Sequence, residues 1–128
     1  MPAFRIRPAA GALAAAIAMS LALVSSAAFA HAKLEKAAPA AGATVASPSE
    51  IRLTFSEAVE PRFSSVTLTG PGGAKAPLGA PKVEAGDQRV LIAPIAKALG
   101  PGAYTVHWRA VSVDTHHTQG TFQFTVKP

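Results

Sequence analysis

Apolar and polar residues alternate along four segments of this chain, and this alternation indicates half-buried β-strands. A period of two places every second side chain on the same face of a strand, so that one face packs inward and the other contacts water. The four segments are residues 51–55, 66–69, 104–110 and 122–126. Each of them is therefore predicted to form a strand.

Three shorter segments complete the strand pattern, and turn signals rich in Gly and Pro separate the segments. The shorter segments are residues 32–36, 75–83 and 88–92, the second of which is interrupted by proline. Seven short strands joined by tight turns are typical of an Ig-like β-sandwich. We therefore predict an all-β, antiparallel β-sandwich of about seven strands, in which residues 95–99 form at most one helical turn.

The alternation also predicts which side chains fill the core between two sheets about 10 Å apart. The expected core residues are Ile51, Leu53, Phe55, Val66, Leu68, Val90, Ile92, Tyr104, Val106, Trp108, Phe122, Phe124 and Val126. Core packing is the expected role of Trp108, because buried aromatic residues dominate the energetics of small cores. His107 falls on the opposite face of the same strand, and we expect it to be a solvated histidine and not a ligand.

Residues 1–30 have the composition of a secretory signal peptide. Two arginines and no acidic residue stand near the N terminus, an apolar run follows over residues 9–24, and small residues of the Ala-x-Ala type end at Ala30. The alternative, an uncleaved membrane anchor, is disfavoured because the apolar run is shorter than the ~20 residues of a spanning helix. We expect a signal peptide over residues 1–30 and one domain over residues 31–128.

Cleavage after Ala30 would make His31 the N-terminal residue, and a terminal histidine is a ready chelator because its α-amino nitrogen and ring Nδ1 can bind one metal ion. Asp114 and His116 supply a carboxylate and a second imidazole. In extended backbone, residues i and i+2 point to the same side with Cα atoms ~6.5–7 Å apart, so both side chains can reach a common ion. Nitrogen and oxygen donors in a planar set suit Cu(II).

Two further residues belong to the candidate site. Glu57 follows the strand segment 51–55 at its end, and strand ends are where binding groups collect. His117 is a possible substitute for His116, although an offset of one residue directs its side chain to the opposite side.

Composition excludes several other kinds of site. The formal net charge of +5 is dispersed along the chain, and two of the positive charges belong to the expected leader, so we expect no nucleic-acid surface. A monomer is the expected state. The chain has no cysteine, which excludes disulfides and thiolate ligands. Both methionines, Met1 and Met19, lie in the leader, so a Cu(I) site built from sulfur is also excluded.

These residues resemble the CopC-like periplasmic copper-resistance and copper-binding proteins over the whole of residues 31–128. The resemblance rests on His31-Ala32, on residues 51–57 and 102–116, and on residues 120–124. It implies a cupredoxin-like, Ig-related β-sandwich that binds Cu(II) in the periplasm for copper resistance or homeostasis. It also implies a binding protein and not an enzyme, often working with a membrane partner of the CopD type.

The resemblance also implies a ligand set. In that family the mature N-terminal histidine gives its amine and ring nitrogen, which here means His31. The Asp-x-His run gives an oxygen and a nitrogen, here from Asp114 and His116, and Glu57 matches an acid that acts as a weak or outer ligand. Some members carry a methionine-rich loop for Cu(I); this chain has none, so a Cu(II)-only protein is implied.

Two other functions fit part of the pattern. Lytic polysaccharide monooxygenases also hold copper on a β-sandwich with an N-terminal histidine, but this domain is short, offers no exposed aromatic cluster for sugar, and places Asp114 where oxygen would bind. A metal-free, Ig-like structural module accounts for the strands. It does not account for a histidine at the cleavage point together with Asp114 and His116.

Overall fold

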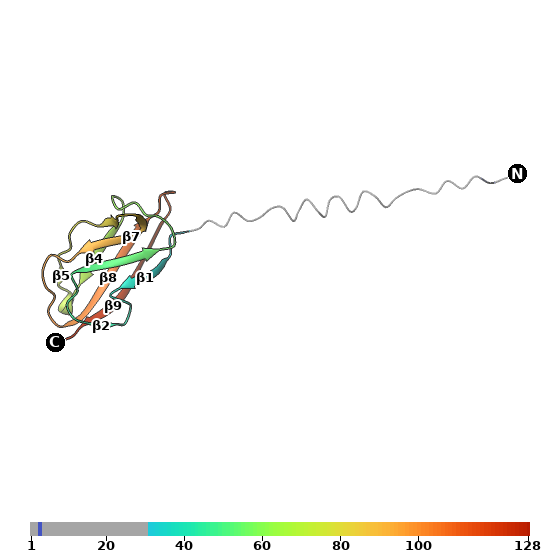
Figure 1. Ribbon diagram of the computed structural model, residues 1–128. Coiled ribbons are helices and arrows are strands. Elements are labelled where there is room, and N and C mark those ends of the chain that lie inside the picture. Colours follow the sequence, from blue (N-terminus) through green and yellow to red (C-terminus); the bar gives the residue numbers. More distant parts are fainter. Residues whose placement is uncertain (1–2, 4–30) are drawn as a thin grey trace.

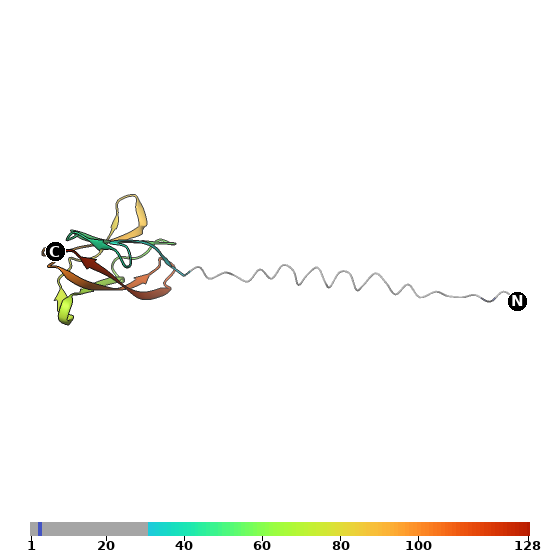
Figure 2. The same cartoon turned by 90° about the horizontal axis from the view of Figure 1, so that it is seen from below.

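The computed structural model describes residue 3 and residues 31–128 of the chain. The predicted signal peptide therefore falls almost entirely outside the described residues. Residues 31–128 form nine strands and a short 3-10 turn. These elements lie in two facing layers, as Figures 1 and 2 show. Within the described residues, no helix is long and apolar enough to cross a membrane.

The two layers are sheets of four and five strands. The first sheet has the order β1 (Leu34–Ala38), β3 (Glu50–Phe55), β7 (Asp87–Pro94), β6 (Lys82–Glu84). The second has the order β2 (Thr44–Val45), β9 (His117–Val126), β8 (Gly102–Val111), β4 (Ser65–Thr69), β5 (Lys75–Ala76), with the 3-10 turn Pro71–Gly73 between β4 and β5. The pairs are antiparallel except for β2 and β9, which run parallel. The predicted all-β sandwich is confirmed.

One detail of the strand prediction is wrong. The proline-interrupted segment 75–83 is not one edge strand, because β5 joins one sheet and β6 joins the other. Proline cannot donate to a strand ladder, so Pro77 and Pro81 bracket the crossing between the sheets. Residues 95–99, expected to form at most one helical turn, form none, and Ile95 makes an isolated bridge with Leu78.

Most of the predicted core is buried, but the phase predicted for β7 is wrong. Leu91 and Ala93 are fully buried in the core, and they pair with the core positions of β3. Val90 and Ile92 pair with the outward-facing Thr54 and Arg52 and lie outside the core cluster, although they are only 5% and 7% exposed. The cause is four consecutive apolar residues in this strand, which carry no alternation that could assign a face.

Trp108 packs at the margin of the core and is half-buried. Its ring lies edge-on to Phe55, with centroids 5.3 Å apart, and it covers Gly120 on the neighbouring strand β9. A Cβ atom at Gly120 would lie 2.7 Å from the indole, so only glycine fits there without a shift. His107 is exposed on the opposite face of β8, as expected.

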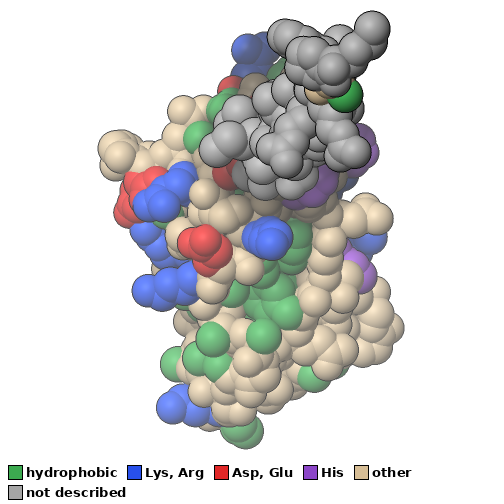
Figure 3. Space-filling model, turned by 90° about the vertical axis from the view of Figure 1, so that its right-hand side faces the viewer, with side chains coloured by type: hydrophobic (Ala, Val, Ile, Leu, Met, Phe, Trp, Pro, Cys, Tyr) green, Lys and Arg blue, Asp and Glu red, His purple; other side chains and the backbone are tan. Residues whose placement is uncertain are grey.

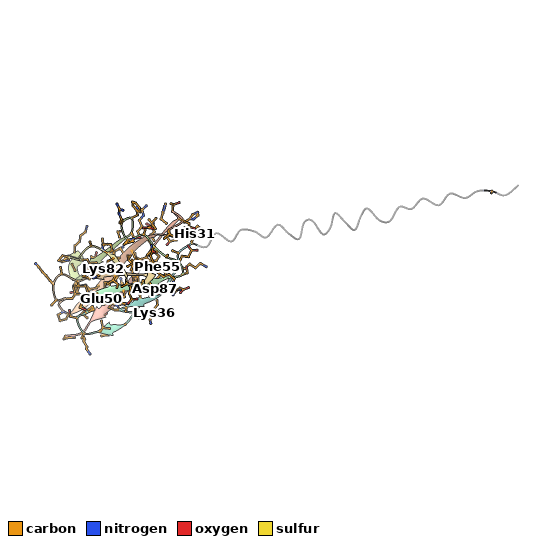
Figure 4. The ribbon with its side chains drawn as sticks, turned by 45° about the horizontal axis from the view of Figure 1, so that its top comes forward. His31, Lys36, Glu50, Phe55, Lys82 and Asp87 are labelled. Atoms are coloured by element: carbon orange, nitrogen blue, oxygen red, sulfur yellow. The ribbon has the colours of Figure 1, made fainter. Side chains whose placement is uncertain are left out.

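The segment 31–33 is bound between the end of β3 and the start of β9, one strand from each sheet. Ala32 is 1% exposed, and its carbonyl accepts a hydrogen bond of 2.7 Å from the Thr118 hydroxyl. Ser56 pairs with Lys33 through both backbone groups: the Lys33 N–H donates to Ser56 Oγ, and the Ser56 N–H donates to the Lys33 carbonyl, each at 2.8 Å. These bonds fix His31 at one end of the sandwich, as Figure 4 shows.

Replacing Gly120 with alanine should force the Trp108 indole to move. We expect Gly120→Ala to lower the free energy of unfolding by about 1–3 kcal/mol, the usual cost of overpacking, and to shift the fluorescence of Trp108, the only tryptophan. Urea unfolding followed by fluorescence measures both effects. Gly100→Ala is the matched control, because a Cβ there meets no atom within 4 Å. Equal stability of the two variants would contradict this packing.

Replacing Thr118 with valine should loosen the segment 31–33 while conserving side-chain shape. The change removes the donor to the Ala32 carbonyl, and a lost hydrogen bond of this kind costs about 0.5–1.5 kcal/mol. We expect faster hydrogen exchange at the Lys33 amide with little change at core amides. Thr121→Val, at an exposed position of the same strand, is the control. Unchanged exchange at Lys33 would show that Thr118 does not hold this segment.

Candidate metal centre

The two histidines singled out in the sequence meet at one end of the sandwich. The imidazole rings of His31 and His116 have centroids 5.2 Å apart and planes at 89°. Figure 3 views the molecule from the side where the segment 31–33 begins, and histidine side chains are visible on its surface. With metal–nitrogen bonds of about 2.0–2.1 Å, two imidazoles on one ion have centroids roughly 4.5–6.5 Å apart. The observed separation fits that range.

A tight turn between β8 and β9 positions Asp114 and His116. The Ser112 N–H donates to the His116 carbonyl at 2.8 Å, and the Thr115 N–H donates to the Ser112 carbonyl at 2.9 Å. Thr115 has a φ of 74°, in the left-handed region that non-glycine residues rarely adopt. The expectation of an extended backbone over residues 114–116 is therefore wrong. The turn, and not strand alternation, brings the two side chains together.

The Asp114 carboxylate lies between a buried hydroxyl and the His116 ring. Ser112 Oγ donates to Oδ1, and Oδ2 lies 3.2 Å from His116 Nδ1. The Ser112 hydroxyl, and after it the His116 ring, hold the pKa of the Asp114 carboxyl below its ordinary value. A lowered pKa keeps the carboxylate charged further into the acid range, so an anionic oxygen donor stands beside the ring.

The orientation of the His116 ring relative to Asp114 decides which of its two nitrogens faces the carboxylate. Because Nδ1 of His116 faces the carboxylate, Nε2 is the ring nitrogen directed elsewhere. Metal-binding histidines commonly turn their second ring nitrogen toward a carboxylate, which fixes the orientation of the ring. The contact between Asp114 and His116 therefore orients the His116 ring and leaves Nε2 on the side away from the carboxylate.

Glu57 and His117, the two other candidate residues, differ in their positions relative to His31 and His116. Glu57 follows Ser56, the residue that binds the segment 31–33, and it is partly exposed at the same end of the sandwich. His117 begins β9 opposite Val111 and is exposed. The structure thus places His116 next to both His31 and Asp114, and these three residues form a group linked through His116. His117 has no contact of this kind with them among the described residues.

The group is not a complete metal cage by itself. Among residues 31–128, no three or more His, Asp or Glu side chains are already gathered at metal-binding distances. In the full chain the backbone nitrogen of His31 forms the peptide bond to Ala30, so it is not a free amine. Cleavage after Ala30 would convert this backbone nitrogen into a free amine.

The sequence analysis missed three hydroxyl residues that hold this site. Ser112 binds the Asp114 carboxylate, while Ser56 and Thr118 bind the backbone of the segment 31–33. Ser and Thr are common at strand ends and loops, and the backbone partners of Ser56 and Thr118 lie on distant parts of the chain. The proximity of Ser112 to Asp114 in the sequence was the only available signal.

Comparison with known proteins gives a consistent result. Residues 34–127 match the family model described as the CopC domain. The chain is 44% identical over 110 residues to Protein YobA of Escherichia coli K12, covering 85% of this chain and 89% of the relative. It is 40% identical to Copper resistance protein C of Xanthomonas campestris pv. juglandis, covering 82% of this chain and 87% of that relative.

Solved structures agree with this assignment. CopC from Methylosinus trichosporium OB3b superposes with a TM-score of 0.71 and 34% identity, covering 77% of this chain and 95% of that one. PcoC, described as a methionine-rich copper resistance protein from Escherichia coli, superposes with a TM-score of 0.69 and 35% identity, covering 77% of this chain and 100% of that one. The resemblance to copper resistance proteins, and not to a copper enzyme, is thereby confirmed. The chain belongs to the CopC family.

Proposed function

We propose that this protein is exported to the periplasm, where its mature domain, residues 31–128, binds Cu(II) as cargo for copper resistance or homeostasis. The proposed ligands are the α-amine and ring Nδ1 of His31, a carboxylate oxygen of Asp114, and a ring nitrogen of His116. Glu57 is proposed as a weak or outer ligand. The signal-peptide pattern of residues 1–30 supports export, since cleavage after Ala30 would supply the amine.

One observation supports this proposal above the others: His31 and His116, from distant parts of the sequence, have ring centroids 5.2 Å apart beside a carboxylate. Amine, imidazole and carboxylate donors fill the tetragonal plane that Cu(II) prefers. Residues 31–128 contain no sulfur atom. A site without thiolate or thioether favours the oxidised ion, so the protein is proposed to handle Cu(II) alone.

The proposed role is to sequester copper or to pass it to a membrane partner of the CopD type. The site lies at the exposed end of the sandwich, where the side chains of His116 and Asp114 are 42% and 51% exposed. A buried ion would have to wait for the fold to open before it could leave. An exposed site at a loop end lets a second protein approach the ion directly, which supports transfer as well as storage.

Extending the mature chain by one glycine before His31 should weaken copper binding strongly, because the amine is displaced while the imidazole stays. We expect the dissociation constant to rise by more than roughly 100-fold, since even changes to groups around ligands cost about 10–100-fold. Quenching of Trp108 fluorescence by Cu(II) gives the measurement. His116→Ala should have a similar effect.

The exposed histidines outside the group provide the controls. His107→Ala and His117→Ala should leave the affinity within about threefold of the starting protein, because both residues are exposed and neither belongs to the group of His31, Asp114 and His116. A large loss in His117→Ala would show that His117, and not His116, supplies the second imidazole. Tight binding that survives both the glycine extension and His116→Ala would refute the proposed ligand set.

Copper affinity should fall on acidification. Free imidazole and α-amino groups have ordinary pKa values of about 6.5 and 7.7–8.0, so both must lose protons to bind a metal near neutrality. Between pH 7 and pH 5 the competing protons should raise the dissociation constant for Cu(II) by roughly 100-fold or more. Titration at the two pH values, with circular dichroism to confirm that the fold persists at pH 5, tests this. Equal affinities would argue against an amine-and-imidazole site.

A further inference from the structure

Ser112 is a buried polar residue at the place where the candidate copper site is built. It is 0% exposed, and Ser64 is the one other buried polar side chain among the described residues. Ser112 lies just after β8, and the backbone at this position bridges to Val59 of the first loop after β3. A buried hydroxyl must find hydrogen-bond partners, because an unpartnered one costs stability.

The Ser112 hydroxyl has one proton and two acceptors within reach. Its Oγ is in contact with Asp114 Oδ1 and lies 3.0 Å from the His116 carbonyl. That carbonyl already accepts the Ser112 backbone N–H at 2.8 Å. The carboxylate is charged and is the closer acceptor, so the hydroxyl proton goes to Asp114.

This assignment gives the two carboxylate oxygens different surroundings. Oδ1 is held by a donor that is fixed in the buried end of the sandwich, while Oδ2 remains on the side of the His116 ring, 3.2 Å from Nδ1. The Asp114 side chain is 51% exposed, so without this donor it would sample other rotamers in water. The hydroxyl therefore orders a carboxylate that would otherwise have to be ordered when the metal binds.

We propose that Ser112 is a positioning residue of the copper site, which holds Oδ1 of Asp114 so that Oδ2 stays beside His116. This inference rests on the proposed function, since it assumes that Asp114 and His116 face the ion. Ser112 itself does not contact the metal. Its contribution is to orient the ligand, which makes the loss of its hydroxyl visible in the spectrum of bound copper as well as in the affinity.

Ser112→Ala tests the proposal, with Ser64→Ala as the matched control. Ser64 is also buried, at 7% exposure, and its hydroxyl also has two partners, the Val111 N–H at 3.0 Å and the Glu60 carbonyl at 2.7 Å. Neither partner is a proposed ligand. Both variants lose one buried hydroxyl at the same end of the domain, so a comparison between them separates general destabilisation from a specific effect on the site.

The variants are prepared as the exported protein, with the N terminus confirmed by mass spectrometry and the fold by circular dichroism. We expect Ser112→Ala to raise the Cu(II) dissociation constant by about 10–100-fold and to change the copper electron paramagnetic resonance spectrum at saturation. Ser64→Ala should bind copper within about threefold of the starting protein with an unchanged spectrum. Equal affinity and spectra for the starting protein and Ser112→Ala would overturn the proposal.

Two further variants keep the test decisive. In an Asp114→Asn background, removing the Ser112 hydroxyl should lower the copper affinity little further, because the carboxylate that it binds is already gone. A further loss of affinity as large as in the starting protein would overturn the proposal, because Ser112 would then act independently of Asp114. Ser112→Thr keeps the hydroxyl, so it should retain the starting spectrum, and this holds even if the alanine variant does not fold. A folded Ser112→Thr that loses copper as Asp114→Asn does would overturn the proposal.

The two proposals fail in distinguishable ways. If the starting protein does not bind Cu(II), or binds it without dependence on His31, the proposed function fails. If binding depends on His31 and His116 but is indifferent to Ser112, the proposed function stands and the positioning role is refuted.

Discussion

Attachment of the segment 31–33 to both sheets is the constraint on which the rest of this structure depends. Chain ends near a domain boundary usually fray unless they are tied down. Here Ala32 is buried, its carbonyl is bound by Thr118 of β9, and the next residue is bound through its backbone by Ser56 after β3. Because these contacts act on the backbone, they hold His31 at the sandwich end whatever side chain stands there, and they bring its ring beside that of His116.

A scaffold of two packed sheets with polar side chains on its loops explains how so small a domain can gather histidine and carboxylate groups at one end. The β8–β9 turn, with Thr115 in a left-handed conformation, carries Asp114 and His116 from one sheet. The first histidine is brought to the same end by contacts that involve the other sheet. Related proteins of the CopC family include one described as methionine-rich, whereas residues 31–128 here hold no methionine. The family fold is thus compatible with sequences of different methionine content.

Much of the fold could be predicted from alternation, and the exceptions have clear causes. The strands and inward faces of β3, β4, β8 and β9 follow the pattern, because their polar positions are open to solvent. Alternation failed in β7, where apolar residues occupy both faces, and only pairing with β3 decided that Leu91 points inward. The candidate ligands His31, Asp114 and His116 were identified from residue chemistry and from resemblance. The extended backbone expected over residues 114–116 was wrong, since sequence spacing does not reveal a turn.

The sequence by itself determined the strand periodicity, the absence of sulfur atoms from residues 31–128, and the donor types available for a metal. Those properties are local or compositional, so they can be read without knowing how the chain folds. The tertiary structure decided which donors meet and what holds them. The bond from Thr118 to Ala32 joins residues that are distant in the chain, and the burial of Ser112 depends on packing against the loop after β3. Long-range contacts of this kind leave no periodic signal, because a hydroxyl looks the same in sequence whether it binds water or fixes a carboxylate.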